Sequence, residues 1–460
     1  MRLLVIGGSD AGISAGLAAR EYDPTAEVTL LVADRYPNFS ICGIPYHVSG
    51  DVPQWRHLAH RSADDLKDAG LHLRLEHRAT TIDPQAHTVT ATTPDGGTVT
   101  LDYDRLVVGT GALPALPPIT GLEHLGPTDG VHVLHSMGDM FAVLTSLEKR
   151  AARSAVVVGA GYIGLEMAEA LTTRGLQVTL LEQLDQVMPT IDAELAAPLA
   201  EHLREHGVNV QHGTKVHTIR TDGTSLAVDT DRGSHPGDIV LVVTGVRPDV
   251  DLAGTAGAEL GVRGAIRVDR QMRASLPDVY AAGDCVHTYH RLLDQDVYLP
   301  LGSTAHKQGR VAGINAVGGD ATFAGPLGTQ AVKVFDLVAA GTGLRDAAAR
   351  QAGFDPVTVA TTADDHKAYY PDATPVHLRI TGDRRTGRLL GAQLLGARGA
   401  EIAKRVDTYA TAISYNATVD DIADLDLSYT PPLGSPWDAV QIATTAWRRQ
   451  LRAGLTDNQS

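Results

Sequence analysis

Residues 154–183, SAVVVGAGYIGLEMAEALTTRGLQVTLLEQ, decide the fold of this chain. A short apolar strand runs into Gly159, Gly161 and Gly164, an amphipathic helix follows, and a second apolar strand ends at Glu182. This order is typical of the βαβ unit that binds a dinucleotide with its pyrophosphate at the helix N-terminus. GxGxxG alone is a weak signal, but the strand, the helix and the acid in register make it specific.

The residue that ends the second strand indicates which nucleotide binds. Glu182 is expected to accept hydrogen bonds from a ribose 2′-hydroxyl and to repel a 2′-phosphate. Gln183 and Leu184 follow it, so no arginine stands there to bind such a phosphate. The sequence therefore favours NADH over NADPH.

A second copy of the pattern begins the chain, in RLLVIGGSDAGISAGLAAREYDPTAEVTLLVADR at residues 2–35. Its turn keeps Gly7 and Gly12, and Ser9 holds the middle position, where a small residue still lets the backbone approach a phosphate. The second strand ends without an acid, and Asp34 follows two residues later. Asp34 is the candidate ribose ligand, with a solvated turn carboxylate as the alternative.

Another pair of segments is also duplicated, YDRLVVGTGALPALPPI at 103–119 and DIVLVVTGVRPDV at 238–250. Each is an apolar strand that runs into Thr-Gly and then proline. These segments look like the strands that close each nucleotide domain. They add three candidate cofactor-binding residues, Thr110, Gly111 and Gly245.

Composition limits the class of protein. A chain of 460 residues is too long for one ordinary core, so two or three domains are expected. A net charge of −15 argues against nucleic acid or an anionic membrane as a partner. Two cysteines cannot build a disulfide framework, which favours a reducing, cytoplasmic setting. The N-terminal apolar run is too short for a signal peptide, and no run is long enough for a transmembrane helix.

The motifs GGSDAG, GTGALP, GAGYIG and AAGDC, in this order, resemble those of the pyridine nucleotide–disulfide oxidoreductases, flavoproteins that bind two dinucleotides. The resemblance covers nearly the whole chain and implies FAD in the first unit and NAD(P)H in the second. It implies an α/β fold of two Rossmann-like three-layer dinucleotide-binding domains and a C-terminal α+β dimerisation domain. The expected ranges are 1–112 and 247–324 for the FAD domain, 113–246 for the NAD(P)H domain, 325–452 for the dimerisation domain and 453–460 for a flexible tail.

The same resemblance assigns two later segments to the flavin. In LPDVYAAGDCVHTYH, residues 276–290, a strand reaches Gly283 and Asp284, and the aspartate would take a ribityl hydroxyl. In YLPLGSTAHKQGRVAGINAVGG, residues 298–319, a helix starts with small residues. The residues that would then pack under the isoalloxazine ring are Ser303, Thr304 and Ala305.

The stretch NFSICGIPYHVSG, residues 38–50, holds Cys42 where a short helix is expected to begin. The positive end of a helix would favour the thiolate, which is the reactive form. Neither CxxC nor CxxxxC is present, so a substrate must supply the second sulfur and form a mixed disulfide with Cys42. The stretch resembles the single-cysteine branch, which includes CoA-disulfide reductases, NADH peroxidases, NADH oxidases and persulfide or polysulfide reductases. Cys285, after Gly-Asp, is expected to be a small buried filler.

Three more residues are candidates for catalysis through this resemblance. His306 matches a histidine at the substrate pocket of CoA-disulfide reductases, with helix-start packing as the alternative. Tyr369 and Tyr429 resemble tyrosines that reach the cysteine from the partner subunit, where a phenol can protonate a departing thiolate; ordinary interface aromatics are the alternative. A homodimer that completes each site is therefore implied. His47 is expected to be an exposed helix histidine, and no metal site is predicted.

The sequence departs from the branch at two places. Asp10 stands where relatives that reduce peroxide or oxygen carry histidine, and a carboxylate would repel a thiolate or sulfenate. The positions that cradle coenzyme A are polar or basic in the branch, and only Ser14 and Asn38 keep that character here. The other four positions are Ala18, Glu21, Ile41 and Trp437. A smaller or less anionic sulfur compound is therefore expected as the substrate.

The expected function is that of an FAD-dependent NADH oxidoreductase that reduces a disulfide, persulfide or polysulfide through Cys42. An NADH oxidase or peroxidase that cycles Cys42 through sulfenic acid is the alternative. A flavin-binding redox sensor without significant turnover is the alternative from another class.

Overall fold

The computed structural model describes residues 1–457 and divides into two compact units. The first unit comprises residues 1–117, 126–151 and 244–326, and the second comprises 118–125, 152–243 and the chain from Leu327 onward. The breaks at Pro117, Thr244 and Pro326 lie close to the domain boundaries that the sequence suggests. Residues 126–151, however, group with the first unit.

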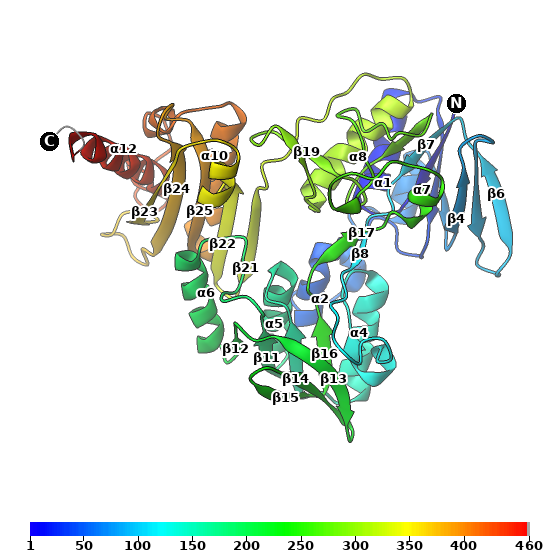
Figure 1. Ribbon diagram of the computed structural model, residues 1–460, viewed down its shortest axis with the longest axis horizontal. Coiled ribbons are helices and arrows are strands. Elements are labelled where there is room, and N and C mark those ends of the chain that lie inside the picture. Colours follow the sequence, from blue (N-terminus) through cyan, green and yellow to red (C-terminus); the bar gives the residue numbers. More distant parts are fainter. Residues whose placement is uncertain (458–460) are drawn as a thin grey trace. The chain divides into compact units, whose positions relative to one another are not determined.

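A parallel sheet forms the centre of the first unit (Figure 1). Its strands are ordered β18-β7-β1-β2-β3, and all the neighbouring pairs run parallel. Their bounds are β1 Arg2–Ile6, β2 Glu27–Val32, β3 Leu71–Leu75, β7 Arg105–Val108 and β18 Val279–Ala281. Apolar runs such as that of β1 are buried in one core, which they share with residues of neighbouring helices and of the strands around Ile82 and Val89. This is the Rossmann-like layer that the sequence predicts.

Helices α1 (Asp10–Tyr22) and α8 (Gly302–Ala316) lie against each other in this unit (Figure 1). Two glycines of α8 make the contact close. A Cβ atom on Gly309 would stand 2.2 Å from the carbonyl oxygen of Ala11, and one on Gly313 would stand 2.0 Å from that of Ala15. Only glycine therefore permits this spacing, and it brings the start of α8 beside the start of α1.

The other elements of the first unit are smaller. Strands β4 to β6 form an antiparallel sheet, and β8 pairs with β17 and β19 with β20 in short antiparallel ladders. The strand bounds are β4 Arg78–Asp83, β5 Thr88–Thr92, β6 Thr98–Asp102, β8 Ala112–Pro114, β9 Val131–His132, β17 Val246–Pro248, β19 Thr288–His290 and β20 Gln295–Val297. The helices are η1 Ile41–Gly43, α2 Ile44–Ser49, η2 Trp55–Leu58, α3 Ala63–Asp68, η3 Pro127–Asp129, α4 Met137–Lys149, α7 Asp251–Thr255 and η4 Val262–Gly264.

The second unit contains the second copy of the βαβ pattern. Strands β12, β11, β10 and β16 lie side by side in this order and pair in parallel, and β13, β14 and β15 form an antiparallel sheet. The bounds are β10 Ser154–Val158, α5 Tyr162–Thr173, β11 Gln177–Leu181, α6 Ala193–Glu205, β12 Asn209–Gln211, β13 Val216–Asp222, β14 Ser225–Thr230, β15 Gly233–Gly237 and β16 Ile239–Val242. The sequence prediction of two dinucleotide-binding folds is thus confirmed.

The C-terminal part of the second unit is an antiparallel sheet with helices packed on it (Figure 1). The strand order is β21-β22-β25-β24-β23. Helix α10 packs on β22 and β25, and α12 packs on β23 and β24, where the buried indole of Trp447 donates to the carbonyl of Val357 at 2.8 Å. The bounds are β21 Gln330–Val334, β22 Leu337–Gly343, α9 Asp346–Gln351, β23 Pro356–Asp364, β24 Pro375–Asp383, β25 Leu389–Ala397, η5 Arg398–Ala400, α10 Ile402–Ser414, α11 Val419–Ala423 and α12 Ala439–Asp457.

The last helix of the chain reaches into the range in which the sequence suggests a flexible tail. Helix α12 continues to Asp457, past residue 453, where the sequence suggests a flexible tail, and residues 458–460 lie outside the described part. Among the described residues, no helix is both long and apolar enough to cross a membrane.

Candidate active site

The two glycine turns have the same geometry. Gly7 and Gly159 adopt left-handed φ angles of 121° and 104°. A Cβ atom on Gly12 would lie 2.1 Å from the carbonyl oxygen of Gly7. A Cβ atom on Gly164 would lie 1.9 Å from the carbonyl oxygen of Gly159. These four positions accept only glycine, as the sequence motif requires.

The middle position of each turn explains why serine replaces glycine in the first copy. Ser9 precedes α1 with φ −102° and ψ −161°, and Gly161 precedes α5 with φ −77° and ψ −169°. Both angles are extended backbone that any residue adopts. No atom lies within 4 Å of a Cβ placed on Gly161, so this side of the turn is open to a pyrophosphate.

Glu182 lies where an acid can meet an adenosine ribose. It follows β11 directly and is buried, and its two carboxylate oxygens accept the backbone N–H groups of Ala160 at 2.8 Å and Leu184 at 2.9 Å. Each oxygen keeps a second lone pair for a ribose hydroxyl. The carboxylate is therefore fixed against the glycine turn before any nucleotide binds.

In the first copy, the position equivalent to Glu182 is Val32. The N–H of Gly7 bonds to the carbonyl of Leu31 as that of Gly159 does to Leu181, so the residue after each carbonyl is equivalent. A Cβ on Gly8 would stand 2.5 Å from a methyl of Val32, which shows that the valine packs against the turn. Asp34 is exposed two residues further on and accepts the N–H of Tyr36 at 2.8 Å.

The residues of the first unit fit FAD in several respects. Gly283 has a φ of 89°, and Asp284 follows it at the end of β18. Burial, and then the charge of Asp10, raise the pKa of Asp284 to about 6, as expected of a carboxyl group beside a site for a polar ligand. The side-chain nitrogen of Asn38 is buried and has no hydrogen-bond partner among the described residues. An orphaned donor of this kind is expected to bond to a bound molecule.

The other residues that the sequence assigns to cofactor binding lie at strand ends and at a helix start. Thr110 donates its hydroxyl to the carbonyl of Asp249 at 2.6 Å, and Gly111 and Gly245 have φ angles of 75° and 108°. The first turn of α8 contains the remaining three, Ser303, Thr304 and Ala305.

Cys42 lies exposed in the single turn η1, which leads directly into α2 with Pro45 near its start. The sequence prediction of a short helix that begins near this cysteine is confirmed. The stretch around it is held by backbone bonds, from Ser40 N–H to Leu58 and from His60 N–H to Asn38, at 2.8 and 2.9 Å.

Cys285 cannot serve as a second redox thiol. It is completely buried, and its thiol donates to the carbonyl oxygens of Ala282 at 3.4 Å and Val108 at 3.7 Å. Burial raises the pKa of this thiol to about 11, so it stays protonated at neutral pH. The prediction that Cys285 is a buried filler is confirmed.

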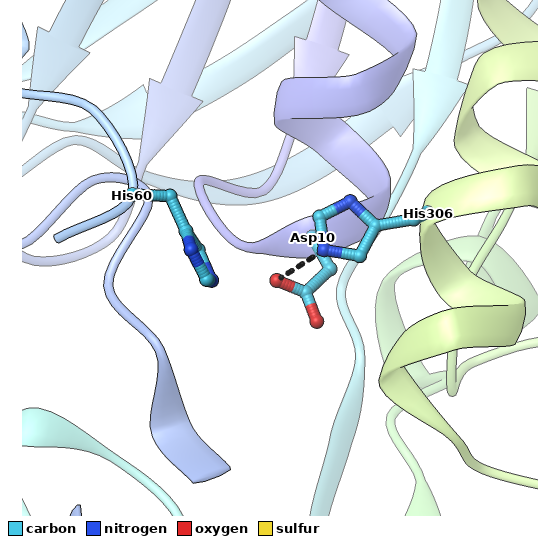
Figure 2. A group of neighbouring side chains, drawn as sticks. All are labelled: Asp10, His60 and His306. Carbon is cyan, nitrogen blue, oxygen red and sulfur yellow. Dashed lines mark ion pairs between the residues drawn. The ribbon is translucent and has the colours of Figure 1, made fainter. Parts of the chain in front are cut away.

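His306 forms a polar network that the sequence did not predict (Figure 2). Its Nε2 lies 3.3 Å from Oδ1 of Asp10, and its Nδ1 lies 2.8 Å from Oγ of Ser14. His60 approaches from the loop after η2, and Asp10, His60 and His306 each offer a ligand atom within 4.8 Å of the others. The three side chains could together hold a proton or a metal ion beside the first turn of α1.

His47 differs from the prediction of an exposed helix histidine. It is half-buried, and its Nδ1 lies 2.7 Å from the carbonyl oxygen of Val52. This contact closes the turn after α2 and gives His47 a structural role.

Tyr369 and Tyr429 belong to the second unit, and both are exposed. Desolvation and a hydrogen bond with Tyr369 hold the pKa of Tyr429 above its ordinary value. The two phenols thus meet, although they are 60 positions apart in the chain. Other large exposed side chains lie close to these two tyrosines in the sequence, namely Tyr370, Leu433 and Trp437.

An aromatic cluster supports the cysteine-bearing stretch and was missed in the sequence. Tyr36, Phe39, Trp55 and Phe141 pack with ring centroids 5.3 to 5.8 Å apart. Their spacing in the chain gives no periodic signal, since they come from a loop, a single turn and a helix. The cluster fixes the stretch that carries Cys42.

Comparison with known proteins decides the family. The model of the pyridine nucleotide-disulphide oxidoreductases matches residues 1–309, and the model of their dimerisation domain matches residues 329–439. The chain belongs to the pyridine nucleotide-disulphide oxidoreductases. It is an oxidoreductase of the class that uses FAD and NAD(P)H.

This oxidoreductase is similar over nearly its whole length to proteins named as sulfur or persulfide reductases and to proteins named as NADH oxidases. It is 34% identical to a CoA-dependent NAD(P)H sulfur oxidoreductase of Pyrococcus furiosus, over 95% of this chain and 97% of the relative. It is 30% identical to an NADH oxidase of Methanocaldococcus jannaschii, over 96% and 98%. A solved NAD-dependent persulfide reductase from A. fulgidus is 38% identical and superposes with a TM-score of 0.93, covering 99% of this chain and 84% of that one.

Proposed function

We propose that this oxidoreductase uses NADH to reduce a persulfide, polysulfide or disulfide, and that Cys42 is the residue that attacks the sulfur–sulfur bond. The observation that carries the proposal is the contrast between the two cysteines. Cys42 is exposed at a helix start in the FAD-binding unit, whereas Cys285 is buried, protonated and bonded to backbone carbonyls. With one available thiol, the second sulfur must come from the substrate.

The proposed reaction begins with the Cys42 thiolate. It attacks one sulfur of the substrate, a new S–S bond forms, the substrate bond breaks, and the departing thiolate takes a proton. Two electrons and one proton then cleave the mixed disulfide, which releases the second thiol and restores the Cys42 thiolate. Bound FAD would supply the chemistry that accepts a hydride from NADH and delivers these two electrons.

Other residues of the chain bind and position the reactants in this proposal. Glu182 holds the adenosine ribose of NADH and disfavours a 2′-phosphate. The glycine turn at Gly7 and the carboxyl group of Asp284 hold FAD, with Asn38 donating its free amide N–H. Asp34 stays a proposed ribose ligand.

We also propose a homodimer in a reducing compartment such as the cytoplasm. The match of residues 329–439 to a dimerisation domain supports it, as do the exposed side chains near Tyr369 and Tyr429. In the dimer the two hydrogen-bonded phenols would reach the partner's cysteine and protonate the departing thiolate.

A comparison of two cysteine variants tests the proposal. Cys42→Ser should lower the rate of sulfur-substrate reduction about a thousandfold or more, while NADH still bleaches the flavin. Cys285→Ser, which keeps a hydrogen-bond donor in the buried site, should retain turnover. Turnover that survives in Cys42→Ser would disprove the proposal, and NADH consumption that depends on oxygen or peroxide alone would favour an oxidase or peroxidase.

A further inference from the structure

A cluster of potential metal ligands lies in the second unit and shares no residue with the glycine turn or Glu182. His202 is in the last turn of α6, and His206 immediately follows that helix. Asp336 lies in the tight turn between β21 and β22. One ligand atom from each residue lies within 4.8 Å of the other two.

The two histidines are spaced for chelation. Residues i and i+4 lie on one face of a helix, and the two rings have centroids 4.4 Å apart. The Nδ1 of His206 lies 2.9 Å from the carbonyl oxygen of His202, which leaves its Nε2 free to bind an ion. Helix C-termini also favour a cation because the last carbonyl groups point outward.

His202 is the better positioned of the two ligands. Its Nδ1 lies 3.5 Å from Glu205, an arrangement in which a carboxylate orients a metal-binding imidazole. Its Nε2 is buried and makes no hydrogen bond within the described residues, although Oδ1 of Asp336 lies 2.6 Å away. The two atoms form an ion pair when the imidazole is protonated, and a metal ion that replaces the proton would be shared by the same two atoms.

The turn that presents Asp336 is held in an unusual conformation. Phe335 has a left-handed φ of 52°, which is strained for an aromatic residue. Its ring stacks on His206 with centroids 4.0 Å apart, and its N–H donates to Glu169 at 2.9 Å. The carbonyl of Asp336 accepts the N–H of Arg398 at 2.7 Å, and its side chain is 77% exposed and free to adjust.

We propose that His202, His206 and Asp336 bind one divalent transition-metal ion of the zinc class, which clamps the end of α6 to the β21–β22 turn. Two imidazoles and a carboxylate, with water in the fourth position, are a ligand set that suits Zn²⁺. Tetrahedral Zn²⁺ with bonds of about 2 Å needs ligand atoms roughly 3.3 Å apart, so a small movement of His206 and Asp336 completes the site.

The test must remove the other groups that could bind zinc. The full-length, FAD-loaded protein would carry Cys42→Ser, His60→Gln and His306→Gln, which eliminate the exposed thiol and the cluster of Figure 2. Calorimetric titration with Zn²⁺ should give one site per chain, and zinc should raise the midpoint of thermal unfolding.

Two further substitutions in this background decide the outcome. His206→Gln and Asp336→Asn alter exposed side chains, and each should weaken zinc binding at least tenfold and abolish the rise in the unfolding midpoint. The proposal fails if the background protein does not bind zinc, or if either substitution leaves the affinity unchanged. Because the readout is binding, it does not depend on whether the enzyme reduces sulfur substrates.

Discussion

The imidazole of His306 bridges Asp10 and Ser14, with its Nε2 3.3 Å from the carboxylate and its Nδ1 2.8 Å from the hydroxyl. The contact ties the start of α8 to α1, at the turn expected to hold the FAD pyrophosphate. It also weakens the repulsion that Asp10 is expected to exert on a thiolate, because a carboxylate paired with a histidine repels a nearby thiolate less than a free carboxylate does. The same pair lies beside His60 (Figure 2).

Coupling between Asp10 and His306 is the first prediction. Urea unfolding of Asp10→Asn, His306→Gln and the double variant should give a coupling free energy of about 0.2–1 kcal/mol. The small value follows from side chains that are 26% and 45% exposed. If the two single substitutions have strictly additive effects on the free energy of unfolding, the contact contributes nothing to stability.

Nucleotide choice should change when the charge of Glu182 is removed. In Glu182→Gln we expect kcat/KM for NADPH to rise about tenfold relative to NADH, because a 2′-phosphate no longer meets a carboxylate. The amide oxygen can still accept one of the two backbone N–H groups. Steady-state kinetics with both nucleotides measure the ratio, and Glu201→Gln, on the exposed side of α6, is the control. An unchanged ratio would assign the preference to other residues.

Contact between α1 and α8 should not tolerate a methyl group. Gly309→Ala should lower the free energy of unfolding by about 1–3 kcal/mol, because the added Cβ meets a backbone carbonyl at 2.2 Å. Gly254→Ala in α7 is the matched control, since open space surrounds that position and alanine stabilises a helix by up to about 1 kcal/mol. Equal effects of the two substitutions would contradict the close packing.

Asp284 should make the FAD-free protein less stable as pH rises. Its pKa of about 6 exceeds the ordinary 3.8, so the folded state keeps a proton that the unfolded state loses between pH 4 and 6. Stability therefore falls as pH rises through this window and stays lower above it. Asp284→Asn should remove that fall and stabilise the FAD-free protein at pH 7 by up to about 3 kcal/mol. Thermal unfolding across pH measures it, and parallel profiles for the two proteins would be the contrary result.

The fold was predictable because its signals are local. Gly7, Gly12, Gly159 and Gly164 each mark a backbone position that no other residue can occupy. Gly7 and Gly159 lie between a strand and a helix, and Gly12 and Gly164 lie in the first turn of that helix. Glycine turns of this kind fix the topology without knowledge of distant contacts.

Much of the site was not predictable because it depends on tertiary contacts. The pairing of Asp10 with His306 joins residues 296 positions apart, and it follows from the glycines that let α8 approach α1. Asp34 stays a predicted ribose acid, since register puts Val32 at the position equivalent to Glu182 and Asp34 two residues beyond it. His202 and His206 form an i, i+4 pair in the sequence, but nothing in the sequence identifies Asp336 as their neighbour.

The most direct test of the central claim is mass spectrometry of the Cys42 peptide after one turnover without oxygen. The purified enzyme would be mixed with one equivalent of a sulfur substrate, quenched at once and compared with a sample then treated with NADH. We predict a substrate-derived sulfur adduct on Cys42 that disappears with NADH. An unmodified Cys42, or a sulfenic acid formed only with peroxide, would contradict the proposed mechanism.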